Sequence, residues 1–74
     1  MPAVRRFPPP WTVEELDACF VVIDSAEQKL AYVYFEEESG RRSAAKLLSK
    51  DEARRIAVNL ARLPEILMAQ PHWR

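Results

Sequence analysis

Hydrophobic residues form two short runs in the first half of the chain and recur at helical spacing in the second half. The runs cover residues 18–23 and 30–35, are rich in Val, Ile, Phe and Tyr, and are bounded by polar residues. Such runs are typical of β-strands. Over residues 50–63, apolar positions recur every three or four residues, which predicts an amphipathic helix. The pattern therefore predicts an α+β fold with the strands first.

The linker between the two runs, residues 24–29, must turn the chain. It lacks the Asn-Gly or Asp-Gly pair of the commonest tight hairpins, so the type of turn stays open. A turn centred between Ala26 and Glu27 makes the runs an antiparallel hairpin. The facing pairs are then Val22 with Ala31, Phe20 with Val33, and Ala18 with Phe35.

This hairpin is apolar on both faces, because side chains alternate with a period of two. Opposite the face just described lie Cys19, Val21, Ile23, Leu30, Tyr32 and Tyr34. A sheet with one wet face alternates apolar and polar residues instead. The helix can cover one face, so the other needs the N-terminal segment or a second copy of the chain.

Residues 41–48 are read as a third strand, because a two-stranded hairpin alone is rarely stable. A helical turn is the alternative, since Ala, Lys and Leu favour helices. Gly40, the only glycine, is expected to take a positive φ in the turn after the acidic run 36–38. The complete expectation is a small three-stranded antiparallel β-meander followed by a C-terminal helix packed on one sheet face (β-β-β-α).

The helix has clear boundary signals. Ser49 and Glu52 form a capping box at its start, and Pro64 ends or kinks it after Leu63. Residues 64–69 are expected to form a second short helix, and residues 71–74 to fray. The domain proper spans residues 12–70.

Residues 1–11 are interpreted as a proline-rich arm that lies across its own domain, with Phe7 and Trp11 at the edge of the core. The alternative is a polyproline ligand for another protein. Residues 12–17 are expected to form one helical turn, capped by Thr12 with Glu15.

Composition predicts one small domain without catalytic chemistry. Its 74 residues include 49% hydrophobic ones, and 11 basic residues balance 11 acidic ones. Cys19 is the only cysteine and His72 the only histidine, so neither an internal disulfide nor a metal cluster is expected. Cys19 is interpreted as a small buried hydrophobe. We expect no enzyme activity, no catalytic residue, no cofactor and a cytoplasmic location, since no signal peptide or membrane span is recognisable.

Two functions fit these observations. The first is a non-catalytic protein-interaction module that binds itself, as a homodimer, or another protein, because small domains often need such support. Its expected interface is Val21, Ile23, Leu30, Tyr32 and Tyr34. The second is nucleic-acid binding through a basic edge of the third strand and the helix start. That edge comprises Arg41, Arg42, Lys46, Arg54 and Arg55, but the net charge of zero disfavours it.

Residues 8–11, 15–22, 31–36, 41–48 and 51–57 resemble a family of short uncharacterised bacterial proteins. The resemblance implies a stand-alone small bacterial protein. It implies no activity, ligand or functional residue. Members of that family tend to carry Asn-Gly at the hairpin turn, where this chain has Ala26-Glu27, which supports the position of the turn.

Overall fold

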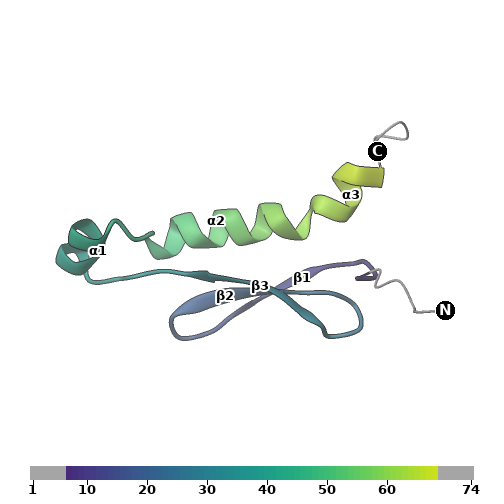
Figure 1. The fold of residues 1–74 in the computed structure, drawn as a ribbon, viewed down its shortest axis with the longest axis horizontal. Coiled ribbons are helices and arrows are strands. Elements are labelled where there is room, and N and C mark those ends of the chain that lie inside the picture. The colour runs from purple at the N-terminus through teal and green to yellow at the C-terminus, as the bar shows by residue number, and fades with distance from the viewer. Residues whose placement is uncertain (1–6, 69–74) are drawn as a thin grey trace.

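The computed structural model describes residues 7–68 and shows a three-stranded antiparallel sheet followed by helices, which confirms the predicted α+β fold (Figure 1). The strands are β1 (Thr12–Glu15), β2 (Cys19–Ile23) and β3 (Lys29–Tyr34). The helices are α1 (Ser39–Ala45), α2 (Lys50–Ala61) and α3 (Leu63–Met68). The sheet has the order β1-β2-β3, so β2 is central and both other strands are edges.

The predicted hairpin between β2 and β3 is confirmed. Phe20 pairs with Val33 and Val22 with Ala31. The backbone N–H of Phe35 donates to the carbonyl of Ala18 over 3.1 Å, which extends the same register. The register changes between Val22 and Ile23, because Ile23 pairs with Lys29 and leaves Leu30 as a bulge.

The third strand was placed in the wrong segment. Residues 12–15 form β1 and pair with β2, for example Val13 with Val22 and Glu14 with Val21. The expected helical turn at residues 12–17 is therefore wrong. Of the four residues, Val13 packs against the core while the other three are exposed, which is the alternation of a half-covered edge strand. The N–H of Leu16 closes the turn into β2 by donating to the carbonyl of Cys19 over 2.8 Å.

Residues 41–48 are not a strand, because most of them lie in α1. The Glu38 side chain caps this helix by accepting from the Arg41 N–H over 2.6 Å. Lys46 ends the helix with a φ of 58°, whereas Gly40 lies in the first turn and does not have the expected positive φ. The helix propensity of the segment decides its conformation, since β1 already completes the sheet. Figure 1 shows α1 projecting beyond one end of the sheet.

The turn between β2 and β3 is organised by a buried carboxylate. Asp24 is 5% exposed, and its Oδ1 accepts from the N–H groups of Ala26 and Gln28 over 2.9 and 2.8 Å. Glu27 takes a φ of 67° and donates its N–H to the Asp24 carbonyl. This side-chain turn replaces the Asn-Gly pair that the chain lacks.

The core lies between the sheet and α2. Its buried members are Phe20, Val22, Phe35, Ala53 and Ala57. The two alanines are fully buried, so α2 can lie close to the strands. The rings of Phe20 and Phe35 pack at a centroid distance of 5.4 Å, and the partly buried Trp11 joins this layer. The Trp11 Nε1–H donates to the Phe7 carbonyl over 2.8 Å.

Helix α2 begins as predicted, with both hydrogen bonds of the Ser49–Glu52 capping box present. It ends at Ala61, two residues before the predicted end, and α3 follows directly. Lys50, at its first turn, lies 2.8 Å from a Glu15 carboxylate oxygen and so joins the start of α2 to the end of β1. The predicted frayed segment, residues 71–74, is outside the described residues.

Candidate interaction surface

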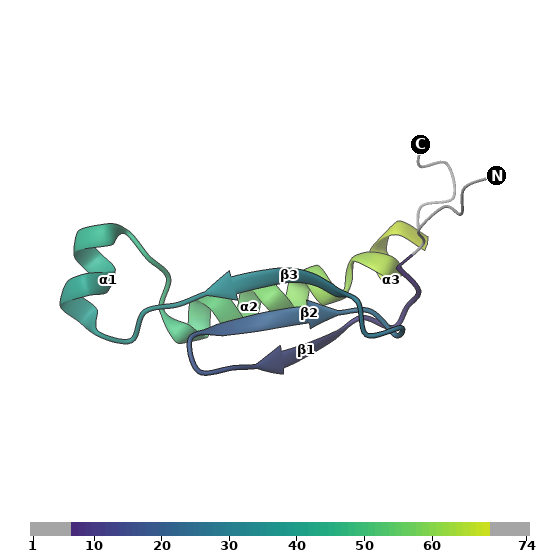
Figure 2. The same cartoon turned by 60° about the horizontal axis from the view of Figure 1, so that its bottom comes forward.

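The sheet has one face that no described helix covers. Figure 2 shows the three strands in front and α2 behind them. The alternation of the paired strands assigns the open face to Thr12, Glu14, Cys19, Val21, Ile23, Tyr32 and Tyr34. Trp11, the last residue of the predicted arm, packs against the core on the helix side instead.

Exposure is uneven across this face. Val21 and Cys19, on the central strand, are 0% and 5% exposed, so almost none of either side chain is accessible. Tyr32 and Tyr34, on β3, are 48% and 63% exposed. Their rings stack on each other at 6.3 Å between centroids and 16° between planes. The exposed aromatic surface of the open face therefore belongs to β3.

The five predicted interface residues fall into two groups. Val21 is buried, and Ile23 and Leu30 are half-buried. Tyr32 and Tyr34 remain accessible to a partner. Aromatic side chains of this kind are enriched at protein interfaces, where the ring is buried and the hydroxyl finds a partner.

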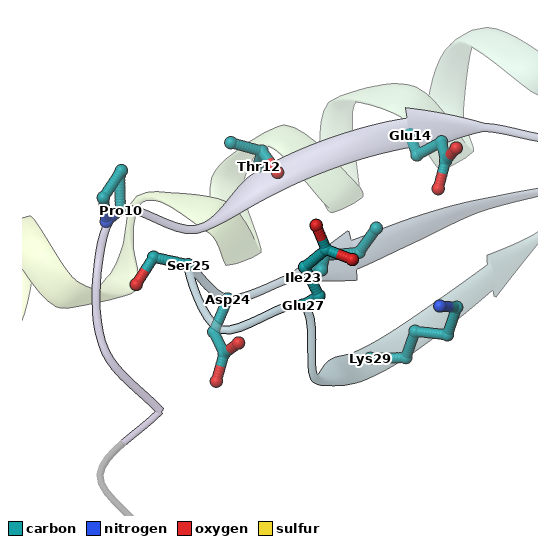
Figure 3. A pocket seen from close by; sticks show the side chains of 8 residues that line it. All are labelled: Pro10, Thr12, Glu14, Ile23, Asp24, Ser25, Glu27 and Lys29. Atoms are coloured by element: carbon teal, nitrogen blue, oxygen red, sulfur yellow. The ribbon is translucent and has the colours of Figure 1, made fainter.

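A shallow hollow of about 570 Å³ lies at the turn end of the open face. Figure 3 shows Glu14 and Lys29 projecting from the two edge strands, with Ile23 between them and the helix behind the sheet. The full lining is Pro10, Thr12, Glu14, Ile23, Asp24, Ser25, Glu27 and Lys29. Its polar groups include no nucleophile paired with a base, and the Asp24 carboxylate is committed to the turn.

The residues of the predicted basic edge lie on two helices, with a carboxylate beside several of them. On α1, Arg41 lies 3.0 Å from a Glu36 oxygen, and Arg42 donates to the Glu36 carbonyl over 3.0 Å. On α2, Arg54 and Arg55 both bind the carboxylate of Asp51. Lys46 is the left-handed residue that ends α1 and is exposed.

The carboxylates of these pairs are held in the ionised state. The hydrogen bond from Arg41 is the main reason that the pKa of Glu36 lies below its ordinary value. Arg55 and then Arg54 lower the pKa of Asp51 in the same way. The pairing leaves these arginines less available to phosphate groups, because each such contact would compete with an existing ion pair.

Among residues 7–68, no group of three or more His, Cys, Asp or Glu side chains is placed to hold a metal ion. No helix in the described part of the chain has the length and apolar character needed to cross a bilayer. Comparison of the chain with protein-family models, with curated proteins and with solved structures finds no match.

Proposed function

We propose that this protein is a non-catalytic protein-interaction module that self-associates through the β3 side of its sheet. The observation that carries the proposal is the exposure of Tyr32 and Tyr34, two large stacked rings on a strand that no described segment covers. Exposed patches of this kind commonly mark contact sites on small domains. We expect the module to act in the cytoplasm.

The small size of the hydrophobic core supports self-association. One helix covers one face of a three-stranded sheet, and the buried hydrophobic core has few members. A chain of this size buries a modest fraction of its surface and gains stability from a partner subunit. A second copy of the chain is always available as a partner, because it is present at the same concentration as the chain itself.

Sedimentation velocity over a protein concentration series tests the proposal. We expect the wild-type chain to shift from monomer to dimer as concentration rises. The double variant Tyr32→Thr/Tyr34→Thr should raise the dimer Kd at least tenfold, because threonine keeps the strand propensity but removes the rings.

The matched control is Val58→Thr, since Val58 is 42% exposed on α2, away from β3. It should leave the dimer Kd within about twofold of wild type, because single exposed residues outside an interface contribute little. A wild-type chain that stays monomeric at all concentrations would overturn the proposal, and so would equal Kd values for the two variants.

Nucleic-acid binding through Arg41, Arg42, Lys46, Arg54 and Arg55 is the second candidate, with less support, because Glu36 and Asp51 engage four of these residues. Phosphate binding gives strongly salt-dependent affinity. A mobility shift of duplex DNA at low salt that disappears in Arg41→Ala/Arg42→Ala would favour this function. Absence of any shift at low salt would remove it.

A further inference from the structure

The outer edge of β3 carries backbone groups that the sheet does not use. In an antiparallel ladder, the N–H and C=O groups of successive residues point alternately to opposite sides of the strand. Phe35 donates inward to Ala18, so Val33 and Ala31 also point toward β2. The N–H and C=O groups of Tyr32 and Tyr34 must then point outward, away from β2. The bond from Leu16 to the carbonyl of Cys19 gives the same alternation for the β1 side of β2.

This free edge has defined limits. At its C-terminal end, the N–H of Glu36 donates to the Leu48 carbonyl over 2.9 Å, so the segment before α2 occupies the edge there. At its N-terminal end, the ladder is interrupted by the bulge at Leu30. The free stretch runs from Leu30 to Tyr34, and its midpoint is Tyr32.

The other edge of the sheet is less suited to pairing. Strand β1 has four residues, two of which are Glu14 and Glu15, and Glu15 is held by Lys50. Short, charged edge strands are the usual protection against further pairing. Strand β3 has six residues, with a single charge, at Lys29, and no proline. Strand β1 is therefore a protected edge, and strand β3 is an open one.

Helix α2 places an exposed apolar side chain above the β3 edge. Ala61 lines a pocket with Trp11, which directly precedes β1, so Ala61 marks the β1 flank of the helix. At 100° per residue, Ile56 lies on the opposite flank, which faces the β3 side. Ile56 is 42% exposed. A strand added beside β3 would place its own apolar side chains under this flank of α2.

We propose that the free edge of β3 pairs antiparallel with β3 of a second copy, with the two-fold axis at Tyr32, to form a six-stranded sheet. This inference rests on the proposed function and specifies the mode of association. With Tyr32 on the axis, the outward groups of Tyr32 and Tyr34 are used, and Leu30 of each copy faces Tyr34 of the other. No other symmetric register uses the whole free stretch.

The side chains fit this register. On the helix side, Ala31 of each copy faces Val33 of the other, so a small residue meets a larger one. At the ends of the paired strands, Lys29 of each copy faces Phe35 of the other, next to the position that Leu48 occupies beside Glu36. Apolar cross-strand pairs stabilise antiparallel sheets.

Disulfide trapping tests the register. In a Cys19→Ala background, Tyr32→Cys places two cysteines on the two-fold axis, with Cα atoms about 5.5 Å apart, a distance a disulfide can span. The matched control is Tyr34→Cys, from a tyrosine on the same face that is more exposed. In the proposed register its two Cα atoms are about 14 Å apart, too far for a disulfide. Circular dichroism checks that both variants keep the wild-type fold.

We expect mild oxidation to convert Tyr32→Cys to a linked dimer at least tenfold faster than Tyr34→Cys. Equal or faster linking of Tyr34→Cys, in a chain that dimerises, would overturn edge pairing and indicate face-to-face packing, while self-association would stand. A wild-type chain that is monomeric in the concentration series would overturn both proposals. A chain that is monomeric alone and pairs its β3 only with a strand of a different protein would likewise overturn both proposals.

Discussion

The two faces of the sheet are built from the same strands but differ in how they are covered. On the helix side, Phe20 and Val22 of β2 are almost fully buried against Ala53 and Ala57 of α2. On the open side, the central Val21 is just as buried, although no described helix lies over it. The helix face is complete within one chain, whereas the open face ends in exposed tyrosines on β3.

If the proposed function is correct, this difference means that substitutions on the two faces should affect different properties, folding stability on one face and association on the other. Changes on the helix face remove packing that one chain needs to fold, so they should lower its stability. Changes at Tyr32 and Tyr34 remove side chains that are 48% and 63% exposed in one chain, so they should mainly change the dimer Kd.

Phe20→Ala should have the largest effect, because it empties the centre of the helix face and removes the ring contact with Phe35. Truncation of a buried phenylalanine costs about 3–5 kcal/mol, which is most of the stability of a small domain. Urea denaturation measures the change. Tyr34→Ala, on the open face, should cost less than about 1 kcal/mol. Similar costs for the two variants would contradict the contrast between the faces.

Asp24→Ala should come next, because it removes the acceptor of two turn N–H groups in a buried position. Leaving such donors without a partner costs about 2 kcal/mol. Ser25→Ala, in the same turn but exposed, is the control and should be close to neutral. The midpoint of thermal unfolding distinguishes them, and a neutral Asp24→Ala would show that the turn does not depend on the carboxylate.

Ser49→Ala should lower stability by about 1 kcal/mol, because the Ser49 hydroxyl caps α2 by accepting from the Glu52 N–H. The control is Ser43→Ala in the middle of α1, where alanine is the better helix former. Chemical denaturation should show a loss for the first variant and none for the second. A loss in both would mean that serine matters for a reason other than capping.

Acid should weaken the helical layer first. The pKa of Glu52 is lowered chiefly by the Ser49 N–H, and that of Asp51 by Arg55. A lowered folded-state pKa means that the unfolded chain binds more protons, so stability is present above the ordinary values and lost as the pH falls through the folded ones. The unfolding midpoint should therefore drop as the pH is lowered below about 5.

Glu52→Gln should make this drop shallower, because glutamine has no proton to gain. A midpoint that does not change between pH 5 and pH 3 would contradict the role given to these carboxylates.

Sequence alone was enough where the signal is local. The capping box of Ser49 and Glu52 and the register that pairs Phe20 with Val33 depend on residues close together in the chain, and both are confirmed. The choice of third strand is non-local, because residues 12–15 and 41–48 compete for one place in the sheet. The isolated Val13 was too weak a periodic signal to decide it, although a four-residue edge strand needs no more.

Only part of the candidate surface was predicted, because some of its features depend on local sequence and others on non-local pairing. The alternation of Tyr32 and Tyr34 is visible in the sequence, so both were named as interface residues. The burial of Val21 and the free backbone edge of β3 depend on the side of β2 on which β1 lies. The sequence analysis expected residues 41–48 to form a strand directly after β3 and to pair with it. The free edge of β3 was therefore not predicted.

Amide hydrogen exchange of the wild-type chain, measured by NMR at low and high protein concentration, tests the central claim most directly. The N–H groups of Tyr32 and Tyr34 should exchange freely in the monomer and become protected as concentration rises. The N–H of Val33, which points toward β2, should be protected at both concentrations. If Tyr32 and Tyr34 exchange equally fast at every concentration, β3 does not pair with a second copy.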